Sequence, residues 1–438
     1  MSPLDPFSVD RELRAGATRW RRWRQQLRRG VIGPAPFGAS TRFGKGLYDA
    51  VQELPPDLPL RRPLARWVYR LAEQRIDALW LAREAELLRL ERHPIREPRE
   101  GPFTVGEMTH AALTGPHSLH WQRARVNASL GLATHRALLW ERRQEIAVRM
   151  GLRSPDVVEL PAGGIYGAAE GWLESSAEAV AELVEPGWGA YVESGLARGA
   201  SEGWPARLTA DTLLDLLGQR DWFRGVTLEP GRLPARYAPT SFVRAFARLG
   251  AAWQVGLAPA QQLFVVAEDP YGLRAWTQGA LWALVACRTP FLRRQLRLAP
   301  HRAQAHEREL ALAVVQWVRL VAVRVLARRA ALAGRSVLAE ASQQLQVRLM
   351  REPERPESLL GLTRLRTDDP QRLAAWFLAA AAYERLVEEH DEDWFRSPRA
   401  VEQLREESKL PQPTEADEAV LERGRAALMG WFAERGGV

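Results

Sequence analysis

The sequence has 438 residues, with 61 Lys and Arg against 53 Asp and Glu, a net charge of +8 and a pI near 10.1. Its 46% hydrophobic and 26% charged residues are typical of globular proteins, which excludes a fibrous or largely disordered chain. A single cysteine excludes a disulfide scaffold and any zinc cluster built from several thiolates. This length corresponds to two or three domains, or to one large helical body.

The first predicted element is a basic helix over Asp10–Arg29, which contains eight arginines together with Trp20 and Trp23. At helical spacing the tryptophans join Leu13 and Ala17 in one apolar stripe, and arginines fill the remaining surface. This pattern is typical of helices that bind an anionic membrane surface, and of sites for single-stranded nucleic acid. Alternatively, the stripe packs on the protein's own core while the arginines stay solvated. The candidate anion-binding residues are Arg19, Trp20, Arg21, Arg22, Trp23, Arg24, Arg28 and Arg29.

Further helices are predicted over Arg61–Arg92 and over Phe103–Met150, the second with an interruption near residue 115. The run Asp156–Leu160 is rich in valine and suggests a short strand. Prolines and glycines around this run place the most plausible domain boundary there. We therefore predict an N-terminal helical region over residues 1–155 and a C-terminal helical domain with an acidic end over residues 156–438.

The second half of the chain continues the helical pattern, and no fixed-period repeat or series of alternating strands appears. The sequence therefore predicts a mainly α, multi-helix globular protein with few or no short strands. Helices are expected over Trp172–Leu183, Phe242–Trp253, Tyr271–Leu298, Ala305–Met350, Pro370–Glu389 and Glu415–Glu434.

The hydropathy pattern predicts neither a secretory signal nor a membrane-spanning segment. The N-terminal residues lack the apolar core and cleavage site of a secretory signal. The most apolar run, Ala311–Ala327, is interrupted by Arg319 and Arg324, so it predicts a buried helix of a soluble protein. We expect a cytoplasmic protein without a transmembrane segment.

Four of the eight histidines lie between residues 110 and 135, and three of them, His110, His117 and His120, belong to a candidate metal site. Glu107 precedes His110 by three residues, which places both on one helical face. His117 and His120 could complete a site for zinc or another divalent metal. Histidines scattered around a turn are the alternative, and no cofactor is predicted beyond this metal.

Three other motifs resemble sites and lack essential parts. His306-Glu307 begins like a zinc-peptidase helix, but Leu310 stands where the second histidine is needed, so an ordinary polar helix start is expected. The glycines of Gly163–Gly167 resemble a phosphate-binding turn without its full spacing. The acidic cluster Glu388–Asp393 could hold a hard cation, or pair with arginines elsewhere.

The order of several segments between about residues 200 and 400 resembles the helical catalytic half of oligoendopeptidase-type (gluzincin) zinc metallopeptidases. These segments are Thr240–Trp253, Asp269–Val285, Arg288–Leu296 and Asp391–Ala400. In that family one helix bears a His-Glu-x-x-His ligand set and a later helix supplies a glutamate ligand. Here the first of these helices contains no histidine, so no ligand or base is carried over. The resemblance implies a zinc-less scaffold whose groove binds a peptide or protein.

Three functions follow in order of preference, and an enzyme is disfavoured because no catalytic set is complete. The first is a non-catalytic helical binding protein for a peptide or protein partner, since Trp and Arg are enriched at interface hot spots and the chain has 17 Trp. The second is a basic protein that binds nucleic acid or an anionic membrane through its Arg/Trp-rich helix. The third is a metal-dependent hydrolase that uses the cluster from His110 to His120.

Overall fold

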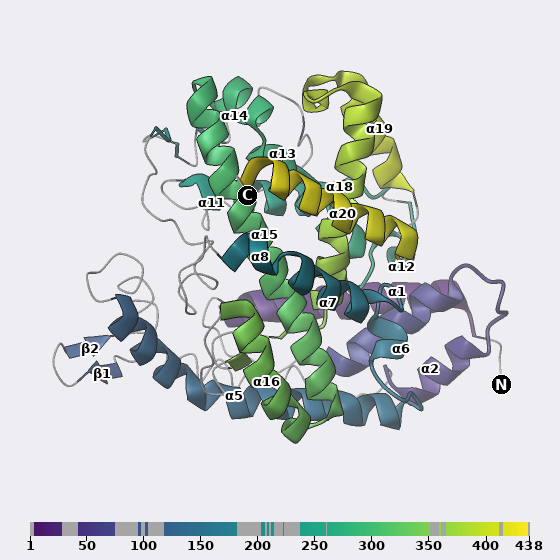
Figure 1. Cartoon of the computed structure of the whole chain (residues 1–438). Coiled ribbons are helices and arrows are strands. Elements are labelled where there is room, and N and C mark those ends of the chain that lie inside the picture. The colour runs from purple at the N-terminus through teal and green to yellow at the C-terminus, as the bar shows by residue number, and fades with distance from the viewer. Residues whose placement is uncertain are drawn as a thin grey trace.

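Helices make up most of the structure. The computed structural model describes residues 4–28, 43–74, 95–97, 101–103, 118–181, 203–205, 208–209, 212–213, 222, 237–259, 261–350, 359–360, 365–410 and 415–436. Within these ranges the strands are β1 (Ile95–Glu97) and β2 (Gly101–Phe103), which pair antiparallel with Ile95 opposite Phe103. The predicted mainly α fold is therefore confirmed (Figure 1).

The described α-helices range in length from 4 residues in α6 to 34 residues in α15. Residues 61–74 are also helical. The helices are α1 (Pro6–Arg28), α2 (Lys45–Gln52), α5 (Ser118–Arg149), α6 (Asp156–Glu159), α7 (Ile165–Ser175), α8 (Ala177–Ala181), α11 (Pro239–Gly256), α12 (Phe264–Ala267), α13 (Leu273–Cys287), α14 (Thr289–Leu296), α15 (Pro300–Ala333), α16 (Arg335–Met350), α18 (Asp369–His390), the 3-10 turn η2 (Trp394–Arg396), α19 (Pro398–Lys409) and α20 (Glu418–Gly436).

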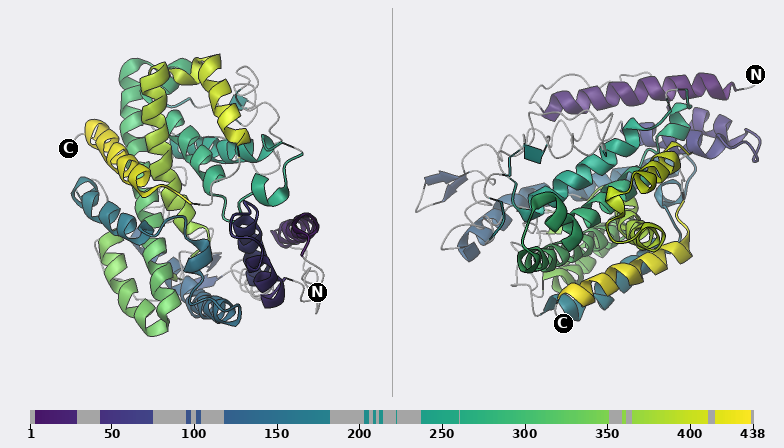
Figure 2. Two further views of the ribbon diagram at one scale, coloured as in Figure 1. Left: turned by 90° about the vertical axis from the view of Figure 1, so that its right-hand side faces the viewer. Right: turned by 90° about the horizontal axis from the view of Figure 1, so that it is seen from above.

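Helix α15 forms the centre of the larger core, with α7, α16, α18 and α20 packed against it (Figures 1 and 2). Within the described ranges it is the one helix long and apolar enough to cross a membrane, and 78% of its most apolar stretch is buried by the rest of the chain. Two arginines within this stretch, Arg319 and Arg324, have hydrogen-bond or ion-pair partners inside the protein. Arg319 Nη1 donates to Leu173 O at 2.8 Å, and Arg324 lies 2.8 Å from Asp369. The prediction of a buried helix over this run is confirmed.

Helices α11 and α13 cross at two glycines that bring their backbones into contact. A Cβ atom at Gly250 would lie 2.5 Å from Gln278 O, and one at Gly279 would lie 2.5 Å from Ala247 O. No larger residue fits at either position without separation of the helices. Earlier on α11, the fully buried rings of Phe242 and Phe246 pack in a tilted arrangement with their centroids 4.9 Å apart.

A second, smaller core holds the N-terminal helices together. It contains Leu13 and Ala17 of α1, residues of the helix over 61–74, and the C-terminal end of α5. Asp10 joins it to α12, because its carboxylate accepts hydrogen bonds from Phe264 N at 3.2 Å and Val265 N at 2.9 Å. Helix α5 contributes to both cores, and the predicted division at residue 155 remains a prediction.

Several predicted element boundaries were wrong. Asp156–Glu159 forms the short helix α6 and not a strand, because its polar groups bind other helices and no strand lies beside it in the described part of the chain. The helix expected over 305–350 is divided at Gly334, where φ is +128°, a conformation that favours glycine. The helix expected over 172–183 is interrupted at Ser176.

Candidate functional site

The predicted metal site falls mostly outside the described residues. Glu107, His110 and His117 lie outside them, and His120 lies in the N-terminal part of α5, where only the helix itself is described. Among the residues that the structure describes, no group of three or more His, Cys, Asp or Glu side chains is placed to hold a metal ion. The histidine site therefore remains a prediction.

The tryptophans of the basic helix α1 are buried, whereas several of its arginines are exposed. Trp20 and Trp23 are only 3% and 4% exposed, and their rings lie 5.0 Å apart on the buried side. Arg19, Arg21 and Arg22 face solvent, and Arg21 pairs with Glu268. The tryptophan stripe thus packs on the protein's own core, as the alternative interpretation expected. Arg24 is partly buried, the side chain of Arg28 is not described, and Arg29 lies outside the described residues.

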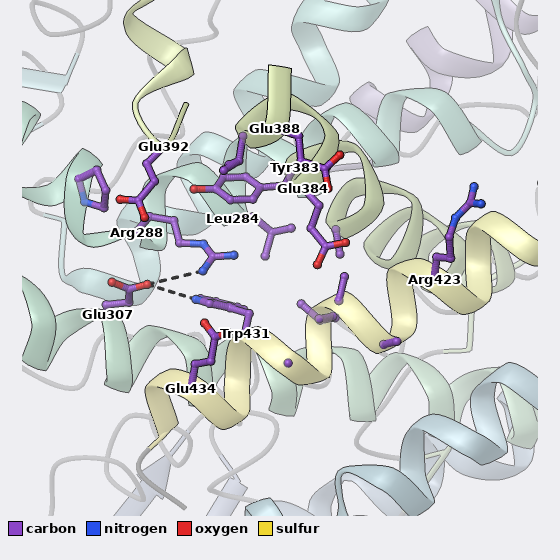
Figure 3. A pocket seen from close by; sticks show the side chains of 17 residues that line it. Leu284, Arg288, Glu307, Tyr383, Glu384, Glu388, Glu392, Arg423, Trp431 and Glu434 are labelled. Carbon is purple, nitrogen blue, oxygen red and sulfur yellow. Dashed lines mark hydrogen bonds and ion pairs between the residues drawn. The ribbon is translucent and has the colours of Figure 1, made fainter. Parts of the chain in front are cut away.

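A cavity of about 640 Å³ opens between α18 and α20, and we call it the α18–α20 pocket (Figure 3). Its floor comes from the junction of α13 and α14 and from the start of α15. Its walls come from the C-terminal half of α18 and from α20. It is lined by Leu284, Arg288, Pro290, Glu307, Ala380, Tyr383, Glu384, Val387, Glu388, Glu392, Arg423, Ala426, Ala427, Leu428, Gly430, Trp431 and Glu434.

Arg288 and its neighbours form a fixed floor at one end of the pocket (Figure 3). The Arg288 guanidinium lies between the rings of Tyr383 and Trp431, with its Cζ 4.5 Å and 4.4 Å from their centroids. Such stacking is favourable because the ring faces carry negative charge. Glu307 holds this arrangement together, since it lies 3.7 Å from Arg288 and accepts from Trp431 Nε1 at 3.2 Å and from Thr289 N at 2.9 Å.

Glu307 is the site residue that sequence reasoning misjudged. The prediction of an ordinary polar helix start was wrong, because His306 and Glu307 are both only 2% exposed. The His306 ring meets Trp204 edge-on at 5.1 Å. The local sequence does not reveal the partner of Glu307, because Trp431 lies 124 residues away. The apolar neighbours of Glu307 on the same helix face were the available signal.

Carboxylates from both α18 and α20 line the pocket (Figure 3). Glu384 and Glu388 are one helical turn apart on α18, and Glu434 lies on α20 across the opening. Partial burial raises the pKa of Glu384, and the negative charges of Glu388 and Glu434 raise it further, while Arg288 opposes them. Part of the predicted acidic cluster, Glu388 and Glu392, therefore lines a cavity.

The glycine turn at the start of α7 is occupied by a side chain of the protein itself. Gly164 N donates to Glu418 Oε1 at 2.8 Å, and Glu418 is the first residue of α20. A carboxylate thus binds where a phosphate-binding turn would hold its ligand, at the positive end of a helix. This hydrogen bond joins residues that are 254 positions apart in the sequence.

The helix that the family resemblance identifies as ligand-bearing, α11, has no histidine, aspartate or glutamate along its length. Phe242 and Phe246 lie one helical turn apart on α11. Both rings are fully buried and pack near Phe291 of α14. An aromatic cluster therefore fills this part of the core.

No protein-family model matches the chain, and no curated protein matches its sequence. Among solved structures, the fold is weakly similar to that of a carboxypeptidase from Pyrococcus furiosus, with a TM-score of 0.47 and 12% sequence identity. The alignment covers 99% of this chain and 100% of the carboxypeptidase chain. The likeness is one of overall shape, and no residue role is transferred from it.

Proposed function

We propose that this chain is a non-catalytic helical binding protein that engages a peptide or protein partner at the α18–α20 pocket. The observation that carries this proposal is the pocket itself, an open cavity of about 640 Å³ with a rigid aromatic floor. Preformed concave sites with an apolar body and a few placed polar groups are the usual form of binding sites. The zinc-less metallopeptidase-like scaffold that the sequence resembles is consistent with binding without cleavage.

The chemistry of the pocket favours a peptide over a small rigid ligand. Leu284, Val387 and Leu428 supply apolar contacts, while glutamates surround the opening. A peptide side chain can enter such a cavity while its backbone remains on the rim. Arg288 is not free to act on a substrate, because both faces of its guanidinium are covered and Glu307 pairs with it.

The test is a selection of peptides from a random display library on the full-length protein. Ala426 is exposed on α20 and lines the pocket, so Ala426→Trp should fill the opening at little cost in stability. Ala419→Trp is the matched control, because Ala419 is exposed on the same helix and does not line the pocket. We expect a family of peptides that binds the wild type and the control and is lost on Ala426→Trp. Equal enrichment on all three proteins would refute the proposal.

A further inference from the structure

We infer that the occupant of the α18–α20 pocket is a lysine- or arginine-bearing peptide segment, whose cationic side chain is held by Glu384, Glu388 and Glu434. This inference rests on the proposed function and specifies its ligand. It combines a cavity of sufficient size with a local excess of negative charge inside a protein whose net charge is +8.

The charge of the lining residues is strongly unbalanced. Five glutamates and two arginines line the pocket, and Arg288 is already paired with Glu307. Four glutamates therefore remain against Arg423, which Figure 3 places at the end of the pocket opposite Glu307. A cavity lined by one sign of charge concentrates ligands of the opposite sign and accelerates their association.

Four carboxylates on the neighbouring surface of α18, α19 and α20 have basic partners within 2.5 to 3.2 Å. The pairs are Glu407 with Arg385, Glu402 with Arg405, Glu406 with Lys409, and Glu422 with Arg425. Within the described part of the chain, Glu384, Glu388, Glu392 and Glu434 form no ion pair. Their carboxylates are thus available to a cation from outside.

The apolar part of the pocket suits the stem of a long basic side chain. Lysine and arginine carry several methylene groups below their charged ends, and these methylenes pack on apolar surfaces while the charge stays near water. Leu284, Ala380 and Val387 line the interior, and the glutamates face solvent near the opening. Arg288 already covers one face of the Tyr383 ring and one face of the Trp431 ring, and the carboxylates supply the charge that recognises the ligand.

The defining measurement is isothermal titration of the full-length protein with terminally blocked octapeptides of Gly, Ala and Leu that carry two lysines or two arginines. A third peptide has norleucine in place of lysine, which keeps the methylenes and removes the charge. We expect the norleucine peptide to bind at least about tenfold more weakly. Single variants Glu384→Gln, Glu388→Gln and Glu434→Gln should each weaken the lysine peptide about two- to fivefold, the usual range of exposed ion pairs.

The variant Glu340→Gln supplies the control, since Glu340 is exposed on α16 and does not line the pocket. Its affinity for the lysine peptide should equal that of the wild type. Equal binding of the lysine and norleucine peptides, or a triple glutamine variant with unchanged affinity, would overturn the inference. If the library selection yields neutral or acidic peptides that require an open pocket, the proposed function stands and this inference fails.

Proton linkage provides an independent readout for Glu384. Its pKa is raised by partial burial and by Glu388 on its own helix and Glu434 on α20, against Arg288. Protonation removes the charge that binds the cation, so lysine-peptide affinity should fall as the pH is lowered from 7 through this raised pKa. The peptide's own charge is constant there. In Glu384→Gln the pH dependence should flatten. An identical profile in both proteins would assign the linkage elsewhere.

Discussion

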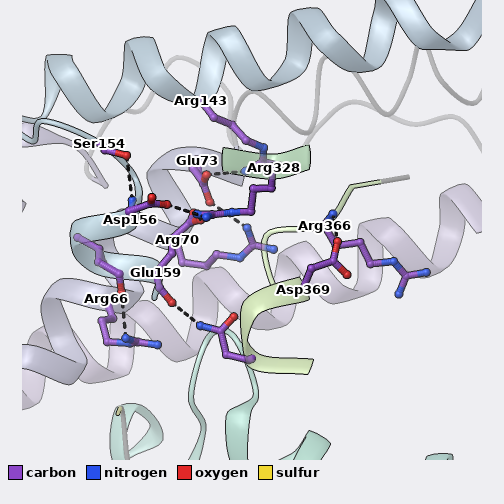
Figure 4. Close-up of polar contacts among 12 residues, drawn as sticks. Arg66, Arg70, Glu73, Arg143, Ser154, Asp156, Glu159, Arg328, Arg366 and Asp369 are labelled. Carbon is purple, nitrogen blue, oxygen red and sulfur yellow. Dashed lines mark hydrogen bonds and ion pairs between the residues drawn. The ribbon is translucent and has the colours of Figure 1, made fainter. Parts of the chain in front are cut away.

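Replacement of Arg328 with methionine is expected to lower the free energy of unfolding by about 3–5 kcal/mol, the usual cost when one partner of a buried ion pair is removed. Arg328 is completely buried. Its guanidinium lies 2.6 Å from both Asp156 Oδ1 and Glu159 Oε2 (Figure 4). It also donates to Tyr166 Oη at 2.7 Å. Methionine has a similar length but leaves Glu159, which is fully buried, without its ion-pair partner.

A second buried carboxylate, that of Glu73, increases the loss of stability expected when Arg328 is replaced. Glu73 is fully buried beside Glu159, with Arg143 at 2.5 Å and Arg70 at 2.9 Å. Burial raises the pKa of Glu159, the charge of Glu73 raises it further, and Arg328 opposes both. Without Arg328 the pKa of Glu159 rises more, so the folded variant takes up a proton that the unfolded chain does not. The stability gap between wild type and variant should therefore narrow as the pH is lowered through this raised pKa.

The measurement is urea unfolding followed by circular dichroism at pH 7 and pH 5. The matched control is Arg329→Met, because the Arg329 side chain is 61% exposed and its nearest carboxylate, Glu170, lies 4.0 Å away. An exposed pair of this kind contributes about 0–1 kcal/mol, so the control should unfold close to the wild type. Equal stabilities for the two variants would contradict the assigned role of the buried cluster.

The buried cluster connects parts of the chain that are distant in sequence. Arg66 Nη1 donates to Val158 O at 2.9 Å, and its other nitrogen lies 3.1 Å from the buried carboxylate of Asp269. Gln371 of α18 donates to Glu159 O. Buried charges are satisfied only when all their partners are in place, so a misassembled arrangement of these helices would leave several of them unpaired. We expect this cluster to specify how the N-terminal helices meet the larger core.

Sequence periodicity predicted the helical fold because it reports which face of each segment is apolar. The buried helix over Ala311–Ala327 and the apolar stripe of α1 were both visible in this way. The pairing of charged residues was not visible in the sequence pattern. Arg328 and Arg329 are adjacent and identical in type, yet one is buried and the other exposed. The two side chains leave α15 on different faces, and the buried one pairs with Glu159, which lies 169 residues before Arg328.

The α18–α20 pocket escaped prediction for the same reason. The acidic cluster at the end of α18 was recognised, but its cavity requires α20 to lie across it. The site of contact between these two helices is set by one glycine. A Cβ atom at Gly424 would lie 1.8 Å from Phe377 O and 2.5 Å from Phe377 C, both backbone atoms of α18. Only glycine permits this approach.

Gly424→Ala is therefore expected to destabilise the protein by about 1–3 kcal/mol, the usual range for overpacking. Backbone atoms cannot rotate away as a side chain would, so the added methyl group must displace α20 from α18. Arg423 and Trp431 move with α20, and the affinity of the pocket for its ligand should fall as well. Thermal unfolding and peptide titration of the same variant measure both effects.

Gly430→Ala is the control that separates a steric effect from a change in helix propensity. Gly430 lies on the same helix, and a Cβ atom there would meet nothing within 4 Å. Alanine is favoured over glycine inside a helix by about 1 kcal/mol, so this variant should be as stable as the wild type or more stable. Opposite signs for the two variants would locate the close contact at Gly424. If both variants gained stability, α20 would have room to move, and the pocket's width would not depend on this glycine.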